Sequence, residues 1–325
     1  MVMVSFPHAS FAAIIAIALV PTPATPAAAA DTSLTVGKAS SVSDAIIPVN
    51  VGDKLGIFKK HGLDLTITDF GGGSKMVQAM TAGALDIADG AGTEMAFVAK
   101  GAPMIGVCES ATTAPFLGIG LPWDSPVKSL ADLKGKVIGV SSPGSFSDWS
   151  GHELARSQGW GENGVKTVAI GGGPAPSLAA LRAHLVDAVI SNVTQFLTFE
   201  ETKEGRLLAP VSTYEGNVAS GLLFASNALA ARNPDAVRAF VAAWIETVDY
   251  MRAHKAETVK IESGITHFDE TVMSREYDLV IGMYTKDCRF DEDSLSTLKR
   301  SFSDMKLLEN EPDMSKLYTE AYLPR

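Results

Sequence analysis

Five segments of this chain of 325 residues combine glycines with small polar residues that can bind a ligand through hydrogen bonds. Each segment follows an apolar run typical of a strand and precedes a run typical of a helix. The first N–H groups of a helix are free and carry partial positive charge, which suits anions such as sulfonate, carboxylate or nitrate. The candidate ligand-binding residues are Ser41, Gly73, Ser74, Gly92, Thr93, Glu94, Ser142, Ser145, Ser147, Trp149, Asn192 and Gln195.

These residue types also have an ordinary structural role, because Ser, Thr and Gly begin helices in any α/β protein. Capping explains each segment taken alone, and five segments meeting at one cleft would favour binding. Phe146 and Trp149 are the aromatic side chains best placed in the sequence to pack on a ligand. Glu94 and Asp148 could accept an amine or ring N–H, although acids in a first helical turn also offset the helix dipole. No candidate segment contains an arginine, so backbone dipoles would hold most of an anion.

Signatures of catalysis and of metal binding are missing from the sequence. It contains no G-x-S-x-G, H-E-x-x-H or P-loop motif, and its six histidines lack metal-ligand spacing. We therefore predict no catalytic residue, no metal site and no cofactor. Cys108 lies in an apolar run, which favours a buried free thiol, while a disulfide with Cys288 stays open for an exported protein.

An internal repeat indicates the architecture. Residues 71–90 match residues 171–191 at an offset of 101, with Asp86 over Asp187. Each copy has a glycine-rich loop, a helix and a short strand, and strands alternate with helices around both copies. This pattern predicts two similar α/β lobes with largely parallel sheets.

The organisation of the chain follows from this repeat and from its first residues. Residues 1–30 carry no Lys, Arg, Asp or Glu and contain an apolar run at 11–20, too short to span a bilayer. We predict a signal peptide cleaved after Ala30 and a periplasmic protein, although the first ten residues lack the usual positive charge. The second lobe is expected at 119–221, inserted into a first lobe of 31–118 and 222–325, so that two crossings form a hinge. Helices are expected from Asn233-Pro234 onward and near 269–284 and 293–305.

Net charge argues against two classes of partner. The chain has 27 basic and 37 acidic residues, for a net charge of −10. An acidic protein without a basic patch is a poor candidate for binding nucleic acid or an anionic membrane surface.

Four segments resemble a known family. Residues 54–63 (KLGIFKKHGL), 80–88 (MTAGALDIA), 129–140 (SLADLKGKVIGV) and 233–240 (NPDAVRAF) are similar to segments of nitrate/sulfonate/taurine-type, or thiamine-precursor-like, substrate-binding proteins of ABC transporters. The resemblance implies a type II periplasmic binding fold with C-terminal helices. It also implies capture of a small organic molecule, delivery to a permease and an ATPase, and a monomeric protein. Ligands of that family include sulfonates, nitrate, taurine, aromatic acids and thiamine pyrimidine precursors, and these segments do not distinguish between them.

Two alternatives stay open at this point. Pyrimidine-synthesising relatives show that an enzyme can use the same fold, but no candidate segment here contains a histidine. A ligand sensor would use the same closure of two lobes, and neighbouring genes would separate sensing from import.

Overall fold

The computed structural model describes residues 1–3, 31–39, 46–161 and 163–324. The chain divides into a unit of residues 1–30 and a unit of residues 31–325, and the second unit is described below. The predicted cleavage site after Ala30 and the candidate residue Ser41 lie outside the described residues. Within the described parts of the chain, no helix is long and apolar enough to cross a membrane.

Two five-stranded sheets with the same strand order form the two lobes. The first sheet has the order β2-β1-β3-β10-β4: β2 (Leu63–Asp69), β1 (Thr32–Lys38), β3 (Ile87–Gly90), β10 (Gly221–Ser226), β4 (Met104–Ala111). The second has the order β7-β6-β8-β5-β9: β7 (Lys166–Ala169), β6 (Val137–Val140), β8 (Ala188–Asn192), β5 (Leu117–Pro122), β9 (Gly205–Pro210). β10 and β5 run antiparallel to both of their neighbours. The prediction of two similar α/β lobes joined by two crossings is confirmed.

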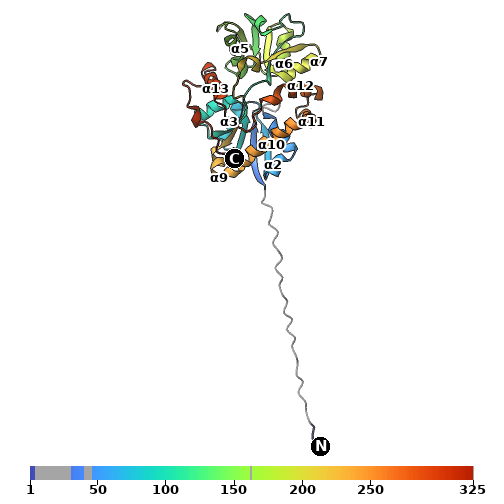
Figure 1. Ribbon diagram of the computed structural model, residues 1–325, viewed down its shortest axis with the longest axis vertical. Coiled ribbons are helices and arrows are strands. Elements are labelled where there is room, and N and C mark those ends of the chain that lie inside the picture. Colours follow the sequence, from blue (N-terminus) through green and yellow to red (C-terminus); the bar gives the residue numbers. More distant parts are fainter. Residues whose placement is uncertain (4–30, 40–45, 162, 325) are drawn as a thin grey trace. The chain divides into compact units, whose positions relative to one another are not determined.

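Helices cover both sheets and continue to the C-terminal end. The first sheet carries α1 (Pro48–Lys54), α2 (Ile57–Lys60), α3 (Gly73–Thr81), the 3-10 helix η2 (Gly92–Glu94) and α4 (Met95–Ala99). The second carries α5 (Phe146–Ser157), α6 (Pro174–Arg182), α7 (Val193–Glu201) and α8 (Ser212–Glu215). The C-terminal set is α9 (Asn227–Arg232), α10 (Pro234–Ala253), α11 (Lys255–Thr266), α12 (Glu270–Val280) and α13 (Glu292–Asp304). In Figure 1, α12 and α13 lie between the helices of the second sheet and those of the first.

The crossings show which edges of the two sheets face each other. Leu222 at the start of β10 pairs with Gly90, the last residue of β3, so the crossings 112–116 and 211–220 meet the first sheet where its parallel strands end. Leu117 at the start of β5 pairs with Asn192, the last residue of β8, so they meet the second sheet at the equivalent edge. The carboxyl ends of the parallel strands in both sheets therefore adjoin the hinge. Ligands of open α/β sheets bind at this edge.

β5 begins at Leu117 and β10 begins at Gly221, and these positions can be compared with the predicted boundaries between the two lobes. The boundaries inferred from the sequence, after residues 118 and 221, would each fall just inside a strand. Assignment of 31–118 with 222–325, and of 119–221, to the two lobes remains a proposal.

The two repeat aspartates have one structural role. Thr35 N donates a hydrogen bond to Asp86 Oδ2 at 3.0 Å, and Asp86 N donates to Thr35 O at 2.9 Å. In the second lobe Val137 N donates to Asp187 Oδ2 at 2.9 Å, and Asp187 N donates to Val137 O at 2.8 Å. Each aspartate thus joins the beginning of the inner parallel strand, β3 or β8, to its neighbour β1 or β6.

Cys108 and Cys288 form a disulfide, which corrects the expectation of a free buried thiol. The pairing depends on a long-range contact, because 180 residues separate the two cysteines. The segment after α12 returns along β4: Thr285 N donates to Ser110 O at 3.0 Å, and Glu109 N donates to Cys288 O at 3.2 Å.

Candidate ligand-binding cleft

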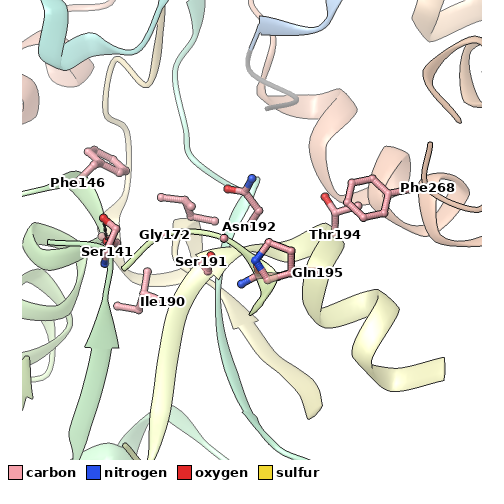
Figure 2. Close-up of a pocket in the computed structure, with 13 residues that line it drawn as sticks. Ser141, Phe146, Gly172, Ile190, Ser191, Asn192, Thr194, Gln195 and Phe268 are labelled. Atoms are coloured by element: carbon pink, nitrogen blue, oxygen red, sulfur yellow. Dashed lines mark hydrogen bonds between the residues drawn. The ribbon is translucent and has the colours of Figure 1, made fainter. Parts of the chain in front are cut away.

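A pocket of about 310 Å³ opens at the strand-end edge of the second sheet (Figure 2). No lining residue has an ionisable side chain. The pocket is lined by Leu117, Ser141, Phe146, Ser147, Gly172, Gly173, Pro174, Ile190, Ser191, Asn192, Thr194, Gln195 and Phe268. All except Phe268 belong to the second sheet or to the loops and helices that follow its strands.

Helices α5, α6 and α7 all begin at this pocket. The Oγ of Ser145 caps α5 by accepting a hydrogen bond from Asp148 N at 3.3 Å. By contrast, α6 and α7 receive no hydrogen bond from the side chains of their N-cap residues, Gly173 and Asn192. In the first turn of α6, Pro174 and Pro176 have no N–H group, which leaves that of Ala175. In the first turn of α7, Val193 N donates to Phe116 O at 2.9 Å, which leaves the N–H groups of Thr194 and Gln195. The dipoles of both helices favour a negative charge in the pocket.

Three serine hydroxyls form a compact group at one side of the pocket. The Oγ atoms of Ser141, Ser145 and Ser147 lie 3.0 Å from one another, and Ser141 N donates to Ser147 Oγ at 3.0 Å. Ser141 and Ser147 also line the pocket. The loop before α5 is thus held in shape by its own hydroxyls while presenting two of them to the cavity.

Gln195 and Glu94 occupy equivalent places in the two lobes, because they differ by the repeat offset of 101. Gln195 Nε2 donates to Ser177 Oγ at 3.3 Å in the first turn of α6. Glu94 lies against the first turn of α3, where a Cβ added to Gly73 would sit 1.7 Å from Glu94 Oε1. Each side chain supports the helix that follows the glycine-rich loop, one with an amide and the other with a carboxyl group.

Glu94 is almost completely shielded from solvent. It is 3% exposed, and burial raises the pKa of its carboxyl group to about 7, against hydrogen bonds from backbone groups and from Thr93 that lower it. The Thr93 hydroxyl donates to Glu94 Oε2 at 3.1 Å. At neutral pH this carboxyl group is therefore divided between its neutral and charged forms.

Two more ionisable groups lie at the same edge of the first sheet. Asp89 and Lys38 pair in register on β3 and β1, and they are 0% and 1% exposed. Burial raises the pKa of Asp89 well above its usual value, against the opposing charge of Lys38. Lys38 Nζ donates to Asn50 Oδ1 and lies 3.6 Å from Asp69 Oδ1, while burial lowers its pKa. The position equivalent to Asp89 in the second lobe is the apolar Ile190, so the two halves of the cleft differ in charge.

The structure brings only some of the sequence candidates to this pocket. Ser147, Asn192 and Gln195 line it. Ser145 supports Ser141 and Ser147, and Ser142 is exposed in the same loop.

Trp149 and the first-lobe candidates lie elsewhere. Trp149 is 3% exposed, its Nε1 donates to Asp304 Oδ2 at 3.1 Å, and its ring packs on Phe146 with centroids 5.3 Å apart. Gly73, Ser74, Gly92, Thr93 and Glu94 lie at the strand-end edge of the first sheet and do not line this pocket.

Phe268 lines the pocket but is not among the candidate residues predicted from the sequence. Of the other lining residues outside the candidate set, Ser141, Ser191 and Thr194 belong to two of the five candidate segments, and Phe146 was predicted as an aromatic contact. Phe268 lies between two C-terminal helices, where the rule that ligands bind at strand ends gives no signal. Among the described residues, no group of three or more His, Cys, Asp or Glu side chains is placed to hold a metal ion.

Comparisons with known proteins agree with this geometry. A family model described as NMT1/THI5 like matches residues 44–258. A protein of Brucella abortus (strain 2308), described as a candidate binding protein, is 26% identical over 235 residues, which cover 70% of this chain and 69% of that protein.

Solved structures share the fold at low sequence identity. The alkanesulfonate-binding protein SsuA from Xanthomonas axonopodis pv. citri, bound to MOPS, has a TM-score of 0.70 at 18% identity, over 90% of this chain and 99% of its own. The desulfurization enzyme DSZB has a TM-score of 0.63 at 14% identity, over 89% and 97% of the two chains. These likenesses show the periplasmic-binding-protein fold and do not by themselves separate binding from catalysis.

Proposed function

Because the chain belongs to the NMT1/THI5-like family, we propose that it is the solute-binding subunit of an ABC importer. In this proposal it acts in the periplasm as a monomer, captures a small organic anion between its lobes and delivers it to a permease and an ATPase. The observation that carries the proposal is the uncharged pocket at the starts of α6 and α7, where the helix dipoles and the N–H groups of Ala175, Thr194 and Gln195 favour an anion.

The walls of the pocket favour an organic rather than an inorganic anion. Leu117, Phe146, Ile190 and Phe268 provide apolar surface around the polar groups. A few placed polar groups within apolar walls are typical of sites for small organic molecules. A sulfonate or carboxylate with an apolar body fits both features, and nitrate uses only the polar part. The alkanesulfonate-binding protein with the same fold supports this class of ligand.

Closure of the lobes would complete the site. The crossings 112–116 and 211–220 form the hinge, and hinge closure around a ligand is the usual motion of such proteins. We propose that closure brings the first-lobe residues Ser41, Gly73, Ser74, Gly92, Thr93 and Glu94 toward Ser142, Ser145, Ser147, Trp149, Asn192 and Gln195.

Catalysis is the competing function, because a desulfurization enzyme shares the fold. The residues that line the second-lobe pocket supply hydroxyls and amides but no His, Cys, Lys, Asp or Glu that could act as a general acid or base. Glu94 of the first lobe is the one candidate of that kind in the proposed site, but its carboxyl group is 3% exposed and packs against the start of α3. Both cysteines of the chain are bonded to each other. These observations support binding without turnover.

Binding can be tested on protein purified from the periplasm of expressing cells. Mass spectrometry of the N-terminus of the same protein tests the predicted cleavage after Ala30. The panel contains alkanesulfonates, taurine, benzenesulfonate, benzoate, a thiamine pyrimidine and nitrate. A ligand at about 100 times its Kd should stabilise the fold by about 2.7 kcal/mol and raise the Tm by several degrees.

Asn192 gives the sharpest variant, because its side chain lines the pocket without capping α7. Asn192→Ala should weaken binding, and Ser157→Ala at the opposite end of α5 should not. Conversion of a panel compound to product would overturn the importer proposal in favour of an enzyme. Absence of binding to every organic anion in the panel would refute the proposed ligand class.

A further inference from the structure

One wall of the pocket comes from outside the second lobe. Phe268 lies in the turn between α11 and α12, beyond the last crossing of the chain. Figure 2 shows its ring beside Thr194 at one end of the pocket, with Phe146 at the other end. The polar groups of Asn192 and Ser191 lie between them.

The turn that carries Phe268 is held by several contacts. Ser263 Oγ donates to Phe268 O at 2.6 Å, and Phe268 N donates to Thr266 Oγ1 at 3.4 Å. The Phe268 ring packs against a buried cluster of Val259, Met273 and Tyr277. These contacts fix the backbone and the ring of Phe268, so it forms a firm boundary of the pocket.

Helix α12 also ties this turn to α7, whose first turn lines the pocket. The Thr194 hydroxyl donates to the buried carboxylate of Glu276. Farther along α7, Arg275 Nη2 donates to Glu200 Oε2 at 2.5 Å, and Thr271 Oγ1 donates to Glu201 Oε1 at 3.1 Å. The distance from Phe268 to the polar start of α7 is therefore set by contacts between α12 and α7.

We propose that Phe268 determines ligand specificity by limiting the length of the ligand's apolar part. The proposal rests on the proposed function, in which the starts of α6 and α7 hold the anionic group. With the head held near Asn192, which lies between the two rings, an apolar chain that extends past Thr194 meets the Phe268 ring, and a longer chain clashes with it. The expected ligands are short organic anions whose apolar body fits between Phe146 and Phe268.

A homologous series of linear alkanesulfonates tests this boundary by calorimetry. Each methylene that enters apolar surroundings should raise affinity about fourfold, the equivalent of about 0.8 kcal/mol. In the unmodified protein, affinity should rise with chain length and then fall once the chain reaches Phe268. Phe268→Ala should move the optimum to chains longer by two or more carbons, and Phe268→Trp should move it to shorter chains.

Phe290→Ala is the matched control, because Phe290 stacks on Tyr318 with ring centroids 4.1 Å apart and does not line the pocket. It should leave the optimum chain length unchanged. If Phe268→Ala fails to fold, Phe268→Leu and Phe268→Trp carry the test. An optimum that is the same in the unmodified protein and in the Phe268 variants overturns this inference and leaves the proposed function standing. If the unmodified protein binds no member of the series, no carboxylate and no other sulfonate, the proposed function fails and this inference fails with it.

Discussion

Replacement of Glu94 by Gln should make the protein more stable at pH 8 and should flatten its dependence of stability on pH. The carboxyl group of Glu94 has an ordinary pKa of 4.5, which burial raises to about 7 in the folded protein. Between these two values the folded state keeps a proton that the unfolded state has lost. Stability therefore falls as pH rises from about 4.5 to about 7, and the loss is complete above the folded pKa.

The size of the effect follows from the shift. A shift from 4.5 to about 7, at about 1.4 kcal/mol per unit, corresponds to a penalty of about 3 kcal/mol at pH 8. Solvent screening reduces this little, because Glu94 is only 3% exposed. An amide cannot ionise, so Glu94→Gln removes the penalty, and its oxygen can still accept the hydrogen bond from the Thr93 hydroxyl. The second lobe already carries an amide, Gln195, at the equivalent place.

Denaturant unfolding of both proteins at pH 5 and pH 8 measures the effect, with exposed Glu309→Gln as the control. Burial also raises the pKa of Asp89, Glu109 and Glu215, so the unmodified protein should itself lose stability over this range. Only the difference between the variant and the unmodified protein reports on Glu94. A variant whose unfolding free energy changes between pH 5 and pH 8 as much as that of the unmodified protein would refute the reasoning.

Two further predictions concern packing and the disulfide. Cys288→Ser should lower the unfolding free energy by about 2–5 kcal/mol, because it removes a cross-link to Cys108 over 180 residues. In denaturant unfolding, the variant should be as stable as the unmodified protein after reduction. Equal stability of the oxidised and reduced forms of the unmodified protein would contradict this prediction. Gly73→Ala should destabilise the protein by about 1–3 kcal/mol, because the new Cβ would lie 1.7 Å from Glu94 Oε1. Gly264→Ala is the control, because Gly264 lies inside α11 and nothing lies within 4 Å of the new Cβ. It should be neutral or stabilise the protein by up to about 1 kcal/mol. Equal Tm shifts in the two variants would show that the contact of the new Cβ at position 73 with Glu94 is unimportant.

Local patterns were sufficient to predict much of the fold. The repeat around Asp86 and Asp187 marks equivalent strand starts, and hydrogen bonds to β1 and β6 explain why an aspartate stands at both. The predicted helix start at Asn233-Pro234 is confirmed by α10, which begins at Pro234. The expected helices near 269–284 and 293–305 correspond to α12, with the short η4 (Ile281–Met283), and to α13. Each of these features depends on residues close together in the chain.

Features that depend on distant residues could not be predicted in the same way. The Cys108–Cys288 pairing requires the segment after α12 to return along β4. Phe268 lies at the pocket because α12 packs on α7, where the Thr194 hydroxyl donates to Glu276. Trp149 lies beside a candidate loop in the sequence, but its ring faces Phe146 and its Nε1 donates to Asp304 on α13. Sequence spacing places a residue near a helix start without showing which way its side chain points.

The difference between the two halves of the cleft bears on how many anionic groups the ligand carries. Two identical lobes would offer equivalent helix starts on both sides, at α3 and at α6. In the first lobe the carboxyl group of Glu94 lies against the start of α3, and Asp89 stands nearby on β3. In the second lobe the equivalent residues are Gln195 and Ile190, which carry no charge. A negative group is therefore favoured at the second lobe, because Glu94 in its ionised form would repel a negative group at the start of α3. In the proposed function, this asymmetry selects a ligand with a single anionic end. The length of its apolar end is then limited by Phe268.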